Sequence, residues 1–378
     1  MRWLQLAFLS VAVLQAAAPH ACGSDILQLI TTTVPVRYQE YEFALRSGAD
    51  GVPRLDWDLY RSRRPAIVER DRTAVVLENS HFESTIIPDM GRIRSFRHKP
   101  SGREQLWINP AAVAIPAHND TGFWITWGGV ESVLPRGEHG TSHALTWSHK
   151  IDEDSASRKA IRMQVVEPLT GLRHTLVYAA YPDRPYLETV ITIENPTAHE
   201  VRFSHWTTAL LAPGGKGELT PRTEFIVPAN EFVAAERPFN RWMADLVGPT
   251  RTSPLRFAEG WKDIGDLMAT PLKEPWYAAY CHEEGDAVVR KVDLAKTPGF
   301  NIWTWGSPPN LQRQREYTAH VPNRGYVEFW NGTAPGFGDE SLSVLGPEEV
   351  LTWTEQMWAV TGLESSDELV AEIRRGNP

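Results

Sequence analysis

The sequence predicts an all-β protein built as a sandwich of large antiparallel sheets. From about Thr73 onward, short runs rich in β-branched and aromatic residues alternate with turn-forming residues. The 27 glycines and 28 prolines suit a chain with many turns. No period of about 20–50 residues recurs, which argues against propellers and solenoids. A hydrophobic content of 42% is enough for a substantial core.

The expected strands follow one another closely along the chain. Residues 73–88 ("TAVVLENSHFESTIIP") predict a strand, a turn and a second strand, and residues 92–108 predict a hairpin with the tip "KPSGRE". Further strands are expected in "AIRMQVVEP", "RHTLVYAAYPDRPYLETVITIENPT" and "EVRFSHWTTALLAPG". The clearest helix signal is Ser365–Gly376, where a serine and an acidic first turn precede a terminal arginine and glycine.

These patterns divide the chain into four parts. Residues 1–24 read as a secretory signal peptide, with Arg2, an apolar run and then small residues near the cleavage point expected at Ala16–Ala18. Residues 25–70 form an N-terminal extension with strand-like pieces, 71–364 the sandwich and 365–378 a short C-terminal helix. We therefore expect an exported protein, periplasmic or extracellular. The alternative for the first part is a lipoprotein signal with a lipid on Cys22, which would be the protein's only contact with a membrane.

Charge and motifs exclude several function classes. The net charge of −9 argues against nucleic acid or an anionic membrane surface as a partner. The sequence contains no phosphate loop, dinucleotide fingerprint or nucleophile elbow, so no cofactor is expected. His139 and His143 have the spacing of helical zinc ligands, but glycine interrupts the segment, so no metal is expected either. The protein is expected to be a monomer.

One loop concentrates chemically active side chains. The segment "TWGGVESVLPRGEHGTSH", Thr126–His143, has too many glycines and prolines for a helix or a regular strand. We expect Trp127 to stack on a sugar ring, and Glu131, Arg136 and His139 to contact hydroxyls or a uronate. The alternative is an ordered surface loop whose acid and arginine pair with each other, a contribution under about 1 kcal/mol.

Tryptophans, a histidine and a glutamate add candidates outside this loop. The chain has 15 tryptophans, several of them clustered, and indoles stack well on sugars; Trp305, in "WTWG", is expected to bind substrate. His205 is in a strand that runs into a glycine-rich loop. A lone histidine in a strand is most often a core or surface residue whose ring nitrogens are hydrogen-bonded. Glu328, in "GYVEFWNG", faces either solvent or a polar cleft. We predict that it lies in a cleft and that the pKa of its carboxyl group is raised there.

Many short segments of the sequence resemble segments of the galactose-mutarotase-like superfamily and occur in the same order. They cover roughly Thr73 to Leu363, and they fit a bacterial branch of it rather than the aldose 1-epimerases themselves. The matching segments are "SHFESTIIPDMGRIRSFRHKPSGREQLWINP", "WGGVE", "YPDRPYLETVITIENPT", "FSHWTTALLAPG", "WTWG", "GYVEFWNG" and "LGPEEVLTWTEQMWAVTGL".

The resemblance implies a β-supersandwich with a sugar site on the concave face of one sheet. It implies Glu328 as the base at the anomeric hydroxyl and His205, facing it, as the acid at the ring oxygen. His139 and Arg92 would bind substrate. The sequence departs from the epimerase signature, because no Asn-His dipeptide precedes the histidine and Ser204 and Trp206 flank it.

Three functions therefore stay open at the level of sequence. One is an exported carbohydrate-active enzyme with epimerase-like or lyase-like acid–base chemistry. The second is a non-catalytic carbohydrate-binding protein, and the third is a structural protein of the cell envelope. The fold alone does not decide among them, because one scaffold hosts many functions.

Overall fold

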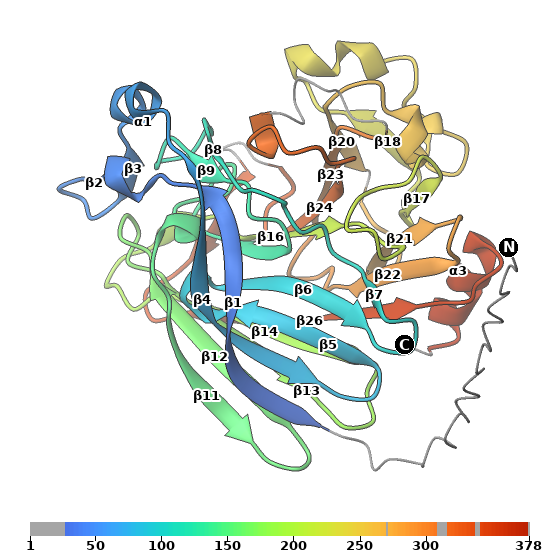
Figure 1. Cartoon of the computed structure of the whole chain (residues 1–378), viewed down its shortest axis with the longest axis horizontal. Helices are drawn as coiled ribbons and strands as arrows, with labels where there is room; N and C mark the ends of the chain where they lie inside the picture. Colours follow the sequence, from blue (N-terminus) through green and yellow to red (C-terminus); the bar gives the residue numbers. More distant parts are fainter. Residues whose placement is uncertain (1–26, 270, 308–315, 337–340, 377–378) are drawn as a thin grey trace, which may run out of the picture.

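Two large antiparallel sheets pack face to face in the computed structural model, which describes residues 27–269, 271–307, 316–336 and 341–376 (Figure 1). The predicted all-β sandwich of large antiparallel sheets is confirmed. The signal peptide predicted for residues 1–24, with Cys22, lies outside the described residues. No helix in the described part of the chain is long and apolar enough to span a membrane.

The larger sheet has 12 strands. In spatial order they are β1 (Gln28–Gln39), β4 (Ile67–Glu78), β5 (Phe82–Ile87), β6 (Arg92–His98), β10 (Val130–Val133), β16 (Trp206–Leu211), β24 (Val327–Gly332), β23 (Gly299–Thr304), β20 (Gly265–Ala269), β18 (Glu231–Ala234) and β19 (Gly248–Pro249), with β7 (Arg103–Glu104) beside β6. The smaller sheet has eight strands: β11 (Ser148–Asp154), β12 (Lys159–Val166), β13 (Arg173–Ala180), β14 (Tyr186–Glu194), β26 (Val350–Val360), β22 (Asp286–Lys291), β21 (Trp276–Cys281) and β17 (Thr223–Ile226).

Short elements complete the fold. The two-stranded sheets are β2 (Leu45–Ser47) with β3 (Pro53–Leu55), β8 (Ala114–Ile115) with β9 (Trp124–Ile125), and β15 (Val201–Phe203) with β25 (Ser343–Leu345). The α-helices whose bounds lie within the described residues are α1 (Trp57–Arg63) and α3 (Ser366–Arg374). The 3-10 helices are η1 (Glu42–Ala44), η2 (Pro88–Met90), η3 (Ser142–Ala144), η4 (Pro238–Met243), η5 (Pro254–Arg256) and η6 (Ala258–Gly260).

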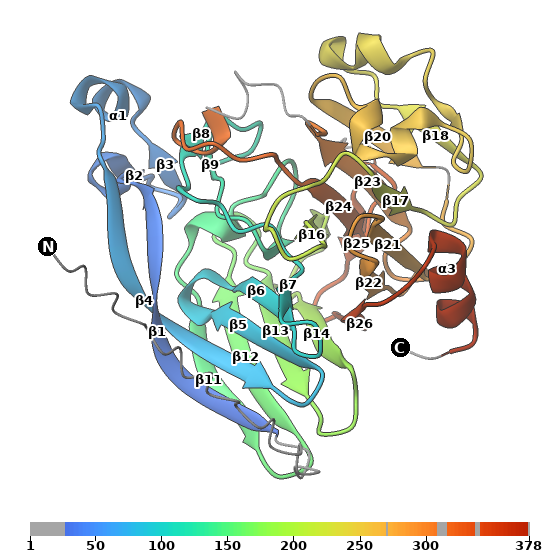
Figure 2. The ribbon, with the colours of Figure 1, turned by 45° about the vertical axis from the view of Figure 1, so that its right-hand side comes forward.

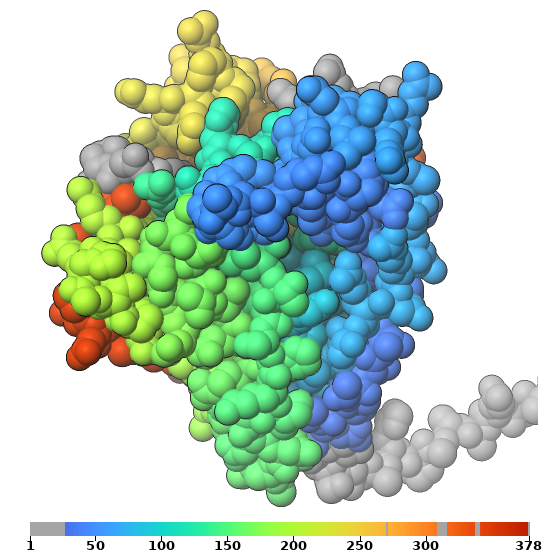
Figure 3. All heavy atoms as spheres, turned by 90° about the vertical axis from the view of Figure 1, so that its left-hand side faces the viewer, coloured from blue at the N-terminus to red at the C-terminus, as the bar shows by residue number. Residues whose placement is uncertain are grey.

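The N-terminal segment is an integral part of the larger sheet. β1 pairs with β4 along its whole length, from Gln28 opposite Glu78 to Gln39 opposite Ile67. The boundary expected between residues 70 and 71 therefore falls inside β4. Figure 2 shows this long ribbon, in blue, beside the green strands of the smaller sheet, and Figure 3 shows the atoms of the blue and green segments side by side on one face of the molecule.

The expected strand "EVRFSHWTTALLAPG" is interrupted. Its first part, β15, pairs with β25, and its second part, β16, enters the larger sheet between β10 and β24. At the break, the Ser204 amide donates to the Pro135 carbonyl and the His205 amide to the Thr333 hydroxyl. His205 therefore precedes a strand in which Trp206 and every second residue after it face away from the other sheet.

The core lies between the two sheets and contains a buried ionic network. Arg290 on β22 forms an ion pair with Glu355 on β26, and both side chains are almost fully buried. Glu355 also accepts hydrogen bonds from Asn331 of the other sheet (2.6 Å) and from Trp353 (3.2 Å). Since Asn331 in turn accepts from Tyr277 (2.8 Å), the network joins the two sheets through buried hydrogen bonds, and Arg290 Nε is its one atom without a partner among the described residues.

We predict that Glu355→Gln lowers the free energy of unfolding by about 3 kcal/mol or more, because it leaves the Arg290 charge buried without a counter-charge. Urea denaturation followed by circular dichroism measures this. The matched control is Glu200→Gln, at an exposed position, which should change the stability by less than about 0.5 kcal/mol. Equal stabilities of the two variants would contradict a structural role for the pair.

Candidate functional site

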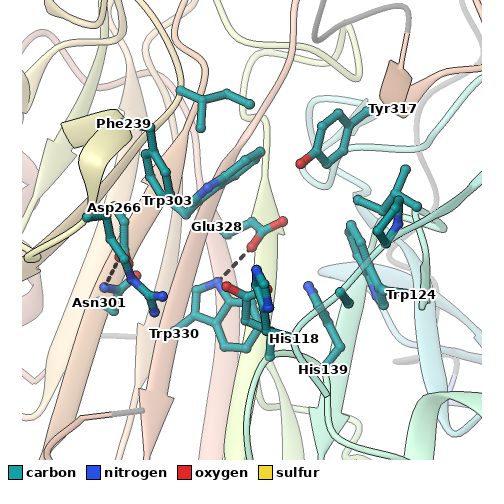
Figure 4. A pocket seen from close by; sticks show the side chains of 16 residues that line it. His118, Trp124, His139, Phe239, Asp266, Asn301, Trp303, Tyr317, Glu328 and Trp330 are labelled. Carbon is teal, nitrogen blue, oxygen red and sulfur yellow. Dashed lines mark hydrogen bonds and ion pairs between the residues drawn. The ribbon is translucent and has the colours of Figure 1, made fainter. Parts of the chain in front are cut away.

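A cleft of about 280 Å³ opens on the outer face of the larger sheet, over β20, β23 and β24 (Figure 4). This volume is near the lower end of the range of about 300–1,000 Å³ that small-molecule sites span. The strands supply its floor and the loops before β9, before η3 and around η4 supply its walls. Its lining includes Trp124, His118, Glu138, His139, Arg237, Phe239, Asp266, Asn301, Trp303, Tyr317, Glu328 and Trp330.

Strand register places the floor residues side by side. Asp266 pairs with Trp303, and Trp303 pairs with Glu328, so these three form one row across the sheet. Asn301 pairs with Trp330 in the neighbouring row. Adjacent strands are about 4.8 Å apart, so the backbones of Asp266 and Glu328 are separated by about 10 Å, with the indole of Trp303 between them.

Glu328 is the central acid of the cleft. Its side chain is only 3% exposed, and it accepts hydrogen bonds from the Tyr326 hydroxyl (2.8 Å) and the Trp330 indole N–H (2.7 Å). Within the described residues it forms no ion pair. Burial raises the pKa of Glu328 to about 7, although the nearby His139 and the two hydrogen bonds oppose this shift. A carboxyl group with such a pKa can exchange a proton near neutral pH.

His139 stands next to Glu328 in the segment Thr126–His143 that the sequence singled out. The expectation that this segment is a loop throughout was wrong, because Val130–Val133 form β10 of the larger sheet. The ring of His139 stacks on Trp124 with centroids 3.8 Å apart and meets the edge of Trp330 at 4.9 Å. Its Nδ1 lies 3.3 Å from Glu131 Oε1, which leaves Nε2 for a ligand. The loop reaches this position because Gly140 has φ 53°, and a Cβ there would lie 2.2 Å from the Leu134 carbonyl oxygen.

Glu131 is the acid that holds His139, and it has a partner of its own. It forms a buried ion pair with Arg92 and accepts from the Trp124 indole (3.2 Å). Burial by itself raises the pKa of Glu131, but Arg92 and His139 outweigh burial and the net pKa lies well below the ordinary value. Glu131 is therefore a fixed anion beneath the cleft, whereas Glu328 is a titrating group inside it.

Asp266 is a second acid on the floor. It accepts from the Asn301 amide and lies 3.6 Å from the Arg237 guanidinium. Burial raises the pKa of Asp266, while Asn301 and Arg237 oppose the shift. Sequence reasoning missed Asp266. In the clusters Trp124/Trp127 and Trp303/Trp305 it chose Trp127 and Trp305, whereas Trp124 and Trp303 line the cleft. The signal for Asp266 was present, because "IGDLMAT" places an acid between apolar residues in a short strand, as "GYVEFW" does for Glu328.

The structure brings some of the predicted residues together and separates others. Glu328 and His139 line the cleft, and Arg92 and Glu131 support it from below. Trp127 instead packs against Tyr38 under β1, with ring centroids 5.2 Å apart. None of Trp127, Arg136 and Trp305 lines the cleft, and their expected contacts with substrate stay predictions.

Arg136 and Trp305 have other surroundings. Arg136 is exposed on the loop and pairs with Asp120 at 3.3 Å, rather than with a glutamate of its own segment. Trp305 is fully buried and packs against Tyr326, with ring centroids 4.6 Å apart. Because Tyr326 donates to Glu328, Trp305 supports the site without reaching it.

The expectation that His205 faces Glu328 is corrected by the structure. His205 points into the space between the sheets, where its Nε2 lies 2.6 Å from the Ser132 hydroxyl and its ring meets that of His174 at 5.1 Å. Residues on β16 that share the face of Glu328 are Trp206, Thr208 and Leu210, and Leu210 is the one that pairs with Glu328. The position on β16 opposite Glu328, where a general acid was expected, therefore carries an apolar side chain.

A comparison with known families places the chain. It belongs to the family described as domain of unknown function DUF5107, whose model matches residues 53–347. No curated protein matches it. Among solved structures, a TPR-domain-containing protein from Parabacteroides distasonis superposes with a TM-score of 0.68 at 17% identity, covering 89% of this chain and 55% of that one. This chain thus spans about half the length of that protein.

Two further solved structures have the fold that the sequence motifs indicated. A galactose mutarotase related enzyme from Lactobacillus acidophilus matches 77% of this chain and 99% of its own, at 12% identity and a TM-score of 0.52. A galactose mutarotase-like protein from Lactobacillus casei matches 76% and 100%, at 9% identity and a TM-score of 0.50. The predicted galactose-mutarotase-like fold is confirmed.

The placement of His205 predicts a pH dependence of stability. Burial lowers the pKa of His174 to about 3 and holds that of His205 well below its ordinary value. In the unfolded chain both take up a proton below about pH 6.5, so acid favours unfolding. Between pH 7.5 and pH 5.5 these two histidines should each lower the free energy of unfolding by about 1.4 kcal/mol, while Glu328, whose pKa is raised in the folded protein, contributes in the opposite direction.

Urea denaturation from pH 8 to pH 5.5 measures this slope. The change in the free energy of unfolding between pH 8 and pH 5.5 should differ between the unmodified protein and His174→Gln/His205→Gln by the contribution of two protons, whatever the stability of that variant at pH 8. A slope unchanged by the double substitution would show that these two histidines are not neutral in the folded protein.

Proposed function

We propose that the cleft binds a sugar and that Glu328 and His139 perform epimerase-like acid–base chemistry on it. The observation that carries the proposal is the buried Glu328 carboxyl, with a pKa raised to about 7 and no ion pair among the described residues, next to an imidazole anchored on Glu131. A carboxyl group and an imidazole, two side chains that serve as general acids and bases, thus share one cleft. The indoles of Trp124, Trp303 and Trp330 supply faces for the C–H surface of a pyranose.

The roles follow from the surroundings of each group. Glu328, as a carboxylate, would take the proton of the anomeric hydroxyl, and His139, as an imidazolium, would donate to the ring oxygen. The ring C–O bond then breaks and an open-chain aldehyde forms; closure from the other face reverses the two transfers. The Glu131 carboxylate stabilises the charged imidazole, as a second acid commonly does for a catalytic histidine.

The charges around the cleft favour this chemistry over a lyase acting on uronates. A lyase needs a cation to bind the substrate carboxylate. Among the described residues that line the cleft, Arg237 is the one arginine or lysine, and it is paired with Asp266. Arg92, below the cleft, is paired with Glu131. The cleft is thus suited to neutral sugars.

A second candidate is a sugar-binding protein without catalytic activity. It is favoured by Leu210, which stands opposite Glu328 on the neighbouring strand where a second proton-transfer group would be well placed. In this case Glu328 would only form a hydrogen bond with a sugar hydroxyl, as acceptor when ionised or as donor when protonated.

We predict that Glu328→Gln, which is nearly isosteric, abolishes acceleration of mutarotation while sugar binding changes little. Polarimetry on anomerically pure aldoses measures the rate, and the fluorescence of the cleft tryptophans measures binding. His139→Gln should lower the rate by about a hundredfold. His205→Gln is the control for a histidine outside the cleft, and in molecules that remain folded it should keep the rate.

Three outcomes would change the assignment. Sugar binding without any acceleration by the unmodified protein would favour the non-catalytic candidate. A Glu328→Gln protein with the unmodified rate would contradict the catalytic role. A large fall in melting temperature would instead show that the carboxyl group stabilises the strands.

Export is a separate proposal based on residues 1–24. The protein expressed with its native N-terminus in a Gram-negative host should be recovered from the periplasm in a processed form. Labelling with radioactive palmitate that is lost in Cys22→Ser would indicate the lipid-anchored form. An unprocessed protein in the cytoplasm would contradict export.

A further inference from the structure

A second and larger cavity, about 970 Å³, lies between helix α3 and β17, the last strand of the smaller sheet. Figures 1 and 2 show α3 beside β21 and β22, apart from the cleft strands. The remaining wall is formed by residues 249–251 and 256–257. We call this cavity the α3 groove.

β17 sets the length of the α3 groove. Arg222 precedes the strand, and at its other end the Pro228 carbonyl accepts from the Lys273 amide (2.7 Å). There the Thr250 hydroxyl also donates to the Ala229 carbonyl (2.8 Å), which holds Arg251 beside the same end. The seven residues from Arg222 to Pro228 extend over about 20 Å. Cations therefore stand at both ends of an elongated groove.

The ion pairs within the groove account for only part of its charge. Glu224 is bound by His282 (2.8 Å) and lies 3.6 Å from Arg256. Glu274 forms a two-pronged pair with Arg374 at 2.6 and 3.1 Å. Asp367 is the third carboxylate in the lining.

The cations left over are Arg222, Arg251 and Lys273, each exposed and without an ion pair among the described residues. The lining thus has five arginine and lysine side chains against three carboxylates, in a chain whose net charge is −9. Such a patch could not be predicted from the sequence, because these three cations are scattered over 52 positions of the chain and only the fold brings them together.

We propose that the α3 groove binds an acidic polysaccharide, whose carboxylate or sulfate groups pair with Arg222 at one end and with Arg251 and Lys273 at the other. The half-buried ring of Phe257 in the lining offers an apolar face to a sugar between those ends. The choice of a glycan rests on the proposed sugar-binding function. The polyanionic character rests on the charges of the groove alone.

Binding of polygalacturonate at low salt tests the proposal. Arg222→Gln/Arg251→Gln/Lys273→Gln should weaken binding by about tenfold or more, and added salt should weaken it in the unmodified protein, because exposed ion pairs are screened. The matched control is Arg61→Gln/Arg63→Gln/Lys150→Gln, which removes three exposed charges from α1 and β11 on the face shown in Figure 3. It should bind like the unmodified protein.

Several results would overturn the proposal. These are no binding of polygalacturonate or dextran sulfate at low salt, an equal loss in the control, or equally tight binding of polyglutamate, which would indicate an acidic peptide. Glu328→Gln should leave polygalacturonate binding intact, and the groove variant should leave mutarotation intact. Failure of one site is thereby distinguished from failure of the other.

Discussion

The alternation of side chains along β20, β23 and β24 is the constraint on which the site depends. Every second residue of these strands faces the other sheet, where Phe300, Phe329 and Tyr277 pack together with ring centroids 4.9–5.9 Å apart. The residues between them face the cleft. Since a shift of one residue would move Glu328 into the core and Phe329 into the cleft, packing of the core fixes the register of the acids.

Two buried acids on the outer face of the larger sheet show how a neighbouring cation decides the chemistry. Glu131 and Glu328 are about equally buried, and burial raises the pKa of both. Arg92 lies against Glu131 and keeps it ionised, whereas Glu328 has a tyrosine and an indole as partners. The difference leaves one acid to orient His139 and the other to exchange protons.

The fold and part of the site could be predicted from sequence because both follow from local patterns. Strand alternation places Glu328 on the face of Trp330, and the same pattern around Asp266 could have located it. His205 could not be assigned, because alternation does not say which face is the cleft and the strand breaks at Ser204. The sequence around Trp124 and Trp127 has no regular alternation of polar and apolar residues. Only the tertiary structure therefore shows that Trp124 faces the cleft and that Trp127 packs on Tyr38.

The titration of the Glu328 carboxyl tests the central claim most directly. Carbon-13 NMR of protein labelled at glutamate side-chain carboxyls, compared with Glu328→Gln, isolates this one group. The structure predicts a resonance that is absent from the variant and titrates with a pKa of about 7. A pKa at or below the ordinary value of 4.5 would show that the carboxyl is solvated or paired with a cation, and would contradict its role as a group that exchanges protons at neutral pH.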